Sequence, residues 1–306
     1  MPPSPDERSR DDLVAPFQIE GQPVRGRVVR LGATVDAVLR AHAYPPPVAN
    51  LLGEACALAA LVGASLKFEG RLIVQAQGNG PVAYVVADYD TDGALRGYCR
   101  FDEQRVRAAH GEGMPGAHAL LGEGVFVMTI DQGGDGERYQ GVTPIEGDTL
   151  ALCAETYFER SEQTPTRVRL AVGEADIGEG SRWRAGGILI QNIAADEARG
   201  DTEEAWARAQ AFFATIAEDE LVDPTISVET LLWRLFHEDG VRVFEATPLR
   251  AFCRCSGARI ASVLASFGNE DQQTMVEPDG RIRVTCEYCS KVYEFTPDEA
   301  RAIAAS

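Results

Sequence analysis

Alternating apolar and polar residues predict a series of strands in the first two thirds of the chain. Residues 24–30 alternate in this way, with Val24, Gly26 and Val28 on one face. Further runs of strand character occupy residues 71–77, 82–88, 93–101, 125–131, 137–142, 168–172 and 187–193. The turn-forming residues 78–81 separate the first two of these runs, which therefore predict a hairpin. Pro278–Gly280 predicts the turn of another hairpin, whose strand leads to the second pair of cysteines near the C-terminus.

Apolar residues at helical spacing predict helices between and after these strands. The helical segments are residues 32–40, 48–66, 149–162, 196–223, 227–238 and 260–267. The segment 48–66 is rich in Ala and Leu and predicts a buried helix, whereas the polar residues 1–12 predict a disordered start. Because strands and helices alternate without regular βαβ units, we expect an α+β fold with a large core of mixed sheet and helix over residues 1–198.

An acidic helical linker is predicted over residues 199–248. Residues 196–223 hold nine acidic and two basic residues, yet they carry an apolar stripe that includes Trp206 and Phe213. Stripes of this kind usually pack on a core. The self-repelling charge also fits a linker whose order depends on docking to the core and to the C-terminal module, and both interpretations stay open.

Four cysteines near the C-terminus form two close pairs, Cys253 with Cys255 and Cys286 with Cys289. Two matched pairs predict one structural Zn²⁺ held by four thiolates, and such a site has no open position for a substrate. The competing interpretations are two structural disulfides of a secreted protein, a thioredoxin-like redox pair, and unrelated buried cysteines.

The zinc prediction makes residues 249–306 a small C-terminal module that oxidants can unfold. A segment of this size buries little apolar surface, and structural zinc contributes about 10–16 kcal/mol of folding free energy in small modules. A disulfide formed within the site removes two ligands at once, so oxidation should release the metal. The remaining cysteines, Cys56, Cys99 and Cys153, are isolated and predict packed thiols.

Charge limits the classes of partner. The net charge is -18 with a pI of about 4.7, which argues against nucleic acid as a partner, because phosphate binding needs a concentrated cationic surface, and against an anionic membrane surface. Residues 248–306 are nearly neutral, with eight acidic and seven basic residues, so the module lacks the charge of a DNA-reading zinc domain. The polar N-terminus and the lack of a long uninterrupted apolar run predict a cytoplasmic protein with reduced thiols.

No catalytic constellation stands out. The four histidines, His42, His110, His118 and His237, are scattered, and neither a zinc-protease nor a nucleophile-elbow motif occurs. We therefore expect a protein that is not an enzyme.

Several short stretches resemble the redox-regulated 33-kilodalton chaperonin family, heat shock protein 33. The matching stretches are residues 44–46 (YPP), 51–54 (LLGE), 66–70 (LKFEG), 77–81 (QGNGP), 139–142 (YQGV), 146–150 (EGDTL), 157–163 (YFERSEQ) and 185–187 (AGG). The two cysteine pairs complete the pattern, and the resemblance covers nearly the whole chain.

The resemblance implies an ATP-independent holdase that binds unfolding client proteins. It implies an inactive form that is reduced and zinc-bound, and activation by hypochlorous acid, or by peroxide with heat, through the disulfides Cys253–Cys255 and Cys286–Cys289. The module and the linker would then unfold and expose apolar surface, and the oxidised form would be a homodimer. For the client-binding surface we expect Trp206 and Phe213, with the core surface that they cover.

Two further expectations come from the residues themselves. A CxxC turn is already bent, whereas a CxC disulfide needs a sharply bent backbone, so Cys286 and Cys289 should pair first. The main alternative function is a constitutive zinc-ribbon module that binds a folded partner whatever its redox state.

Overall fold

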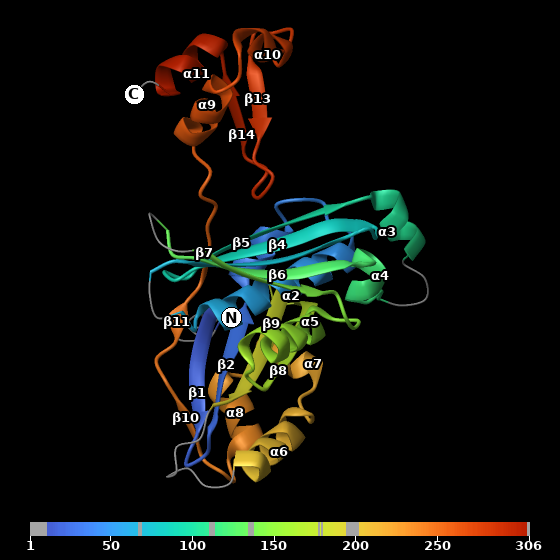
Figure 1. Ribbon diagram of the computed structural model, residues 1–306, viewed down its shortest axis with the longest axis vertical. Coiled ribbons are helices and arrows are strands. Elements are labelled where there is room, and N and C mark those ends of the chain that lie inside the picture. Colours follow the sequence, from blue (N-terminus) through green and yellow to red (C-terminus); the bar gives the residue numbers. More distant parts are fainter. Residues whose placement is uncertain are drawn as a thin grey trace. The chain divides into compact units, whose positions relative to one another are not determined.

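The computed structural model describes residues 11–66, 69–109, 114–133, 138–176, 178, 180–193 and 202–304. The chain forms two compact units, Met1–Ala251 and Phe252–Ser306. The larger unit combines two sheets with helices (Figure 1), so the α+β class predicted from the sequence is confirmed. The division at residues 198 and 248 stays a prediction.

The first sheet of the larger unit has the strand order β10-β1-β2-β9-β8, and β11 also pairs with β1. All of its pairings are antiparallel. The strands are β1 (Leu13–Ile19), β2 (Val24–Leu31), β8 (Thr166–Asp176), β9 (Ser181–Asn192), β10 (Val241–Val243) and β11 (Thr247–Pro248). The first of these lies next to the predicted disordered start and was not anticipated from the sequence.

The second sheet has the strand order β12-β5-β4-β3-β6-β7. Its strands are β3 (Arg71–Gly78), β4 (Val82–Asp90), β5 (Ala94–Phe101), β6 (Gly124–Asp131), β7 (Arg138–Pro144) and β12 (Arg250–Ala251). The pairing of β12 with β5 is parallel and the other pairings are antiparallel. The predicted hairpin over residues 71–88 is confirmed as β3 and β4.

Helix α2 (Pro46–Gly63) packs against strands of both sheets and forms the centre of the main core (Figure 1). Pro46 and Pro47 occupy its first turn, where a missing N–H costs no hydrogen bond. By length and composition α2 is apolar enough to cross a membrane, but 83% of this stretch is buried inside the unit. Packing between two sheets therefore accounts for its apolar sequence.

Shorter helices complete the main core. They are α1 (Ala33–Leu39), α3 (Glu103–Ala109), α4 (Ala117–Leu121) and α5 (Leu150–Tyr157), which continues as one π-helical turn, η2 (Phe158–Glu162). The hydroxyl of Thr149 caps α5 by accepting a hydrogen bond from the N–H of Leu152 at 3.2 Å.

Residues 11 and 12 are ordered, contrary to the predicted disordered start, because the Asp12 carboxylate accepts hydrogen bonds from Gly32 and Thr34 at the start of α1.

Three helices cover the other face of the first sheet: α6 (Thr202–Phe213), α7 (Glu218–Val222) and α8 (Val228–Phe236) (Figure 1). The sequence predicted one helix over residues 196–223, and the structure corrects this to two. Residues 194–201 lie outside the described part, and the helix ends at Phe213 although the residues that follow are not helix breakers. Residues 214–217 form a bend that turns Ile216 into the core.

The smaller unit contains α9 (Gly257–Ala265), α10 (Asn269–Thr274), β13 (Ile282–Thr285), β14 (Val292–Phe295) and α11 (Pro297–Ala304). Among the described residues of this unit, five are buried in its core: Ala261, Leu264, Ile282, Phe295 and Ala300. The sequence placed the hairpin turn at Pro278–Gly280. In the structure the second cysteine pair makes the turn between β13 and β14, because these strands pair on either side of it.

Candidate functional site

The four cysteines Cys253, Cys255, Cys286 and Cys289 lie together in the smaller unit. Their sulfur atoms are all within 4.8 Å of one another, and each side chain is half-buried. The sulfurs of Cys253 and Cys286 are 3.7 Å apart, and those of Cys255 and Cys289 are 3.4 Å apart. Each of these short distances links a cysteine of the first pair to a cysteine of the second. The cluster therefore brings together the segment before α9 and the turn between β13 and β14.

The first pair is held by the start of α9. Ser256 follows Cys255 directly, and its hydroxyl accepts a hydrogen bond from the N–H of Arg259 at 3.2 Å. This N-cap fixes where the helix begins and therefore where the extended segment with the two cysteines ends.

The second pair is held by a tight turn. The N–H of Cys286 donates to the carbonyl of Lys291 at 2.9 Å, and the N–H of Ser290 donates to the carbonyl of Cys286 at 2.9 Å. Ser290 has a left-handed backbone with φ of 56°, which closes the turn and directs the chain into β14. Both sulfurs of the pair consequently point to one side of the hairpin end, where the first pair lies.

The thiols of the cluster differ in acidity. Burial works to raise the pKa of Cys255, but hydrogen bonds from the Tyr293 hydroxyl and from the neighbouring thiols outweigh it and lower the pKa to about 7. Burial raises the pKa of Cys289 to about 12, and it also raises the pKa of Cys253. Without a cation the cluster therefore favours a thiolate at Cys255 over thiolates at Cys253 and Cys289.

The donor set and its spacing fit one zinc ion. Four sulfurs at about 2.3 Å from a tetrahedral centre lie about 3.8 Å from one another. The two measured sulfur distances of 3.7 and 3.4 Å are close to that value. A bound Zn²⁺ would compensate the negative charge of the thiolates, and Cys253, Cys255, Cys286 and Cys289 are the residues that would hold it.

The other three cysteines are buried in the larger unit, as expected for packed thiols. Burial raises the pKa of Cys56 to about 12 and that of Cys153 to about 11, and it raises the pKa of Cys99 as well. Thiols of this kind react slowly with oxidants, because the thiolate is the reactive form.

Trp206 and Phe213, the expected client-binding residues, both lie on α6 and face the first sheet. Phe213 is 5% exposed and belongs to the second apolar cluster of the larger unit, and Trp206 packs on this cluster while half-buried. The guanidinium carbon of Arg169 lies 5.9 Å from the centre of the Phe213 ring. The two aromatic residues therefore belong to a covered surface.

The comparisons with known proteins agree on one family. A family profile described as "Hsp33 protein" matches residues 12–296. A 33 kDa chaperonin of Caulobacter vibrioides is 69% identical over 299 residues, which are 97% of this chain and 99% of that protein. A 33 kDa chaperonin of Escherichia coli O7:K1 is 36% identical over 284 residues, covering 93% and 92% of the two chains.

The chain belongs to the Hsp33 family.

The resemblance drawn from the sequence is thereby confirmed, and the names of the Hsp33 relatives support a chaperone function. The crystal structure of the 33 kDa chaperonin (Heat shock protein 33 homolog) from Thermotoga maritima has the same fold, with a TM-score of 0.78, coverage of 95% and 97% of the two chains, and 23% identity.

In this Hsp33 chain, sequence reasoning missed a set of arginines beneath α6, α7 and α8. We call these three helices, which lie within the predicted linker of residues 199–248, the linker helices. Arg169, Arg184 and Arg30 lie on three neighbouring strands, β8, β9 and β2, and each donates to a backbone carbonyl of the linker. The acceptors are the carbonyls of Ile216, Val222 and Asp223, respectively. Val222 and Asp223 end α7, so the two arginines that bind them satisfy carbonyls that the helix leaves free.

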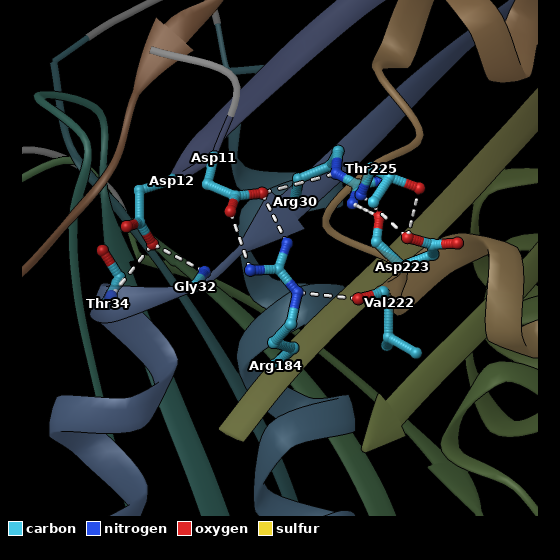
Figure 2. A network of polar contacts seen from close by, with 9 residues as sticks. All are labelled: Asp11, Asp12, Arg30, Gly32, Thr34, Arg184, Val222, Asp223 and Thr225. Atoms are coloured by element: carbon cyan, nitrogen blue, oxygen red, sulfur yellow. Dashed lines mark hydrogen bonds and ion pairs between the residues drawn. The ribbon is translucent and has the colours of Figure 1, made fainter. Parts of the chain in front are cut away.

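Asp11 balances the charge of two of these arginines (Figure 2). Its carboxylate accepts two hydrogen bonds from Arg184, at 2.7 and 2.6 Å, and lies 3.5 Å from Nε of Arg30. Burial works to raise the pKa of Asp11, but the hydrogen bonds and the charge of Arg184, together with Arg30, lower it. A sequence signal was present in retrospect, because Arg30 interrupts the otherwise apolar run Val28–Leu31.

Proposed function

We propose that this protein is a redox-regulated, ATP-independent holdase that binds unfolding proteins under oxidative stress. The observation that carries the proposal is the cluster of four free cysteines whose sulfurs lie within 4.8 Å of one another, in a member of the Hsp33 family. Such a cluster can hold a metal ion when reduced and can form disulfides when oxidised.

In the reduced state Cys253, Cys255, Cys286 and Cys289 would hold one Zn²⁺ and keep the small module folded. The five-residue core of this module supports the dependence on metal, because so little buried apolar surface stabilises a fold weakly. A reducing compartment, such as the cytoplasm, would preserve this state.

In the oxidised state the thiolates would pair as Cys253–Cys255 and Cys286–Cys289. Formation of each disulfide transfers two electrons from two thiolates to an oxidant such as hydrogen peroxide or hypochlorous acid, and the sulfurs then no longer hold the metal. The module would unfold as a consequence. We further propose that the oxidised protein forms a homodimer, which size-exclusion chromatography of the two redox forms would test.

Client binding would follow the undocking of the linker helices from the first sheet. The apolar cluster between the linker helices and the first sheet supports this step, because undocking would expose both of its halves. One half includes Phe213 and Trp206 on the helices, and the other includes Phe17 and Ile188 on the strands. A contiguous apolar surface of this kind, once exposed, is typical of a protein-interaction site.

The deciding experiment follows the aggregation of a denatured client protein by light scattering. The full chain is added either reduced and zinc-loaded or oxidised and zinc-free. We expect suppression of aggregation by the oxidised form alone, without ATP. Equal activity of the two forms would contradict redox control and would instead favour a constitutive interaction module.

A further inference from the structure

Tyr293 connects the two cysteine pairs through its hydroxyl group. It lies on β14, directly after the second pair, opposite Val284 of β13. Its hydroxyl nevertheless donates a hydrogen bond to the sulfur of Cys255, in the first pair, at 3.2 Å. The contact therefore spans 38 residues of sequence and joins the hairpin to the segment before α9.

The Tyr293 ring is fixed by its neighbours. It packs on the small apolar core of the module, and the Lys291 ammonium nitrogen lies 5.0 Å from its centre. Gly257, at the start of α9, lies beside the ring: a Cβ at this position would be 3.9 Å from Tyr293 Cδ1. Because these contacts fix the ring, the hydroxyl needs no large rearrangement to reach the sulfur.

In the zinc-bound site all four cysteines are thiolates, so the thiolate fraction no longer limits their reaction with oxidants. In that state a hydroxyl that donates to a thiolate lowers the electron density on the sulfur. The hydrogen-bonded sulfur is a weaker nucleophile, and its position as a metal ligand is more sharply defined. A disulfide sulfur is a poor acceptor, so the bond from Tyr293 favours the reduced site over the oxidised one.

We propose that Tyr293 is a positioning residue that holds the Cys255 thiolate as a metal ligand and slows its reaction with oxidants. The inference rests on the proposed redox function. With hydrogen peroxide, one thiolate of the pair Cys253–Cys255 attacks a peroxide oxygen, giving a sulfenic acid and hydroxide after proton exchange. The second thiolate then displaces the sulfenic oxygen as hydroxide, so that two thiolates and one peroxide yield one disulfide and two hydroxide ions. Tyr293 acts on the first of these steps when Cys255 is the attacking sulfur.

The test compares the full-length protein with the variant Tyr293→Phe, which keeps the ring and its packing. Zinc affinity is measured by competition with a chromogenic chelator, and zinc release is followed after addition of hydrogen peroxide. Mass spectrometry of alkylated peptides gives the rate of oxidation at each cysteine. We expect an affinity about tenfold lower, since loss of an outer-shell partner of a metal ligand typically costs that much. We also expect oxidation at Cys255 to accelerate more than oxidation at Cys286.

The control is Val292→Ala, on the same strand, whose side chain is 52% exposed and carries no hydroxyl. It should leave zinc affinity and all oxidation rates unchanged. The inference would be overturned if Tyr293→Phe matched the wild type, or if both variants accelerated all four cysteines equally. Failure of the oxidised wild type to suppress client aggregation would refute the proposed function but not these zinc measurements, so the two failures are distinguishable.

Discussion

Glu54 is a half-buried carboxylate with charged neighbours. It lies on α2 and faces a cavity of about 760 Å³, which is also lined by Glu155, Glu218, Arg167 and Arg169. Burial raises the pKa of Glu54 to about 7, against a weak hydrogen bond from the N–H of Leu150, and the charge of Glu218 raises it further. Burial also raises the pKa of Glu155.

This environment predicts a pH dependence of stability. The folded pKa of Glu54 lies above the unfolded value of about 4.5, so its contribution is most favourable below pH 4.5 and is lost as the pH rises through 7. The loss should amount to about 1–3 kcal/mol. Glu54→Gln should flatten the profile over this range, as measured by urea unfolding monitored through tryptophan fluorescence. A profile that keeps its slope in the variant would exclude Glu54 as the cause.

The order of disulfide formation is a second prediction at the residue scale. Cys286 and Cys289 already form a turn closed by two backbone hydrogen bonds of 2.9 Å, so little backbone rearrangement is needed to join them. During partial oxidation the Cys286–Cys289 disulfide should therefore accumulate first, as seen by mass spectrometry after trapping free thiols. Earlier appearance of Cys253–Cys255 would show that local turn geometry does not control the order.

Residue types explain which parts of the candidate site could be predicted. Cysteine pairs have a spacing with few alternative uses, so the cluster was identified from the sequence alone. The binding partners of Arg30 and Arg184 could not be predicted, although Arg30 interrupts an apolar run, because arginine in a strand usually reaches solvent and only the tertiary structure reveals the linker carbonyls that these residues bind. Tyr293 was missed for the same reason, since its bond to Cys255 joins two segments whose proximity the sequence does not encode locally.

At the scale of elements, the docking of α7 on β9 depends on one glycine. A Cβ on Gly186 would lie 2.0 Å from the carbonyl oxygen of Leu221, so the helix backbone lies directly on the strand. Gly186→Ala should force α7 away and destabilise the docked linker by about 1–3 kcal/mol. Hydrogen exchange of α7 and α8 would measure this.

Gly173 provides the matched control on β8. A Cβ there would meet only a methyl carbon of Val222, at 3.7 Å, which is an ordinary contact. Gly173→Ala should leave exchange in α7 and α8 unchanged. If the two variants behaved alike, the close approach at Gly186 would have no special role in docking.

Charge in the same interface gives a further prediction. Arg184→Leu removes the hydrogen bond to Val222 and leaves Asp11 with a weaker partner, so the linker should be destabilised by about 2 kcal/mol. The variant should bind a hydrophobic dye at a lower temperature than the wild type. Arg208→Leu is the control, because the Arg208 side chain is 46% exposed and its ion pairs with the exposed Glu238 and the half-buried Asp239 contribute about 1 kcal/mol or less.

The strengths and failures of element prediction have the same origin. Long periodic segments such as α2, and hairpins with clear turn residues such as β3 and β4, follow from local sequence. The break between α6 and α7 does not, because the chain bends there to place Ile216 in the core, and the residues of the bend carry no turn signal. The hairpin of the module was misplaced because Pro278–Gly280 is a strong turn signal that precedes β13 instead of joining two paired strands.

For the whole molecule, removal of zinc should unfold one unit and spare the other. Chelation under reducing conditions should abolish protection from hydrogen exchange in α9, β13 and β14, while the strands of both larger sheets stay protected. All three tryptophans, Trp183, Trp206 and Trp233, lie in the larger unit. Their fluorescence therefore reports on the larger unit and not on the module. Persistence of a folded module without metal would contradict the proposed role of the cysteines.

The chain between the linker helices and the cysteines is paired along much of its length. After α8, residues 241–243 pair with β1, residues 247–248 pair with β1 again, and residues 250–251 pair with β5. The N–H of Leu249 adds a hydrogen bond of 2.7 Å to the carbonyl of Asp12. Unfolding that begins at Cys253 and proceeds along the backbone must break these pairings in turn before it reaches α8. In the proposed switch this segment would therefore delay the release of α8, so that a brief opening of the metal site would reverse before it reached the linker helices.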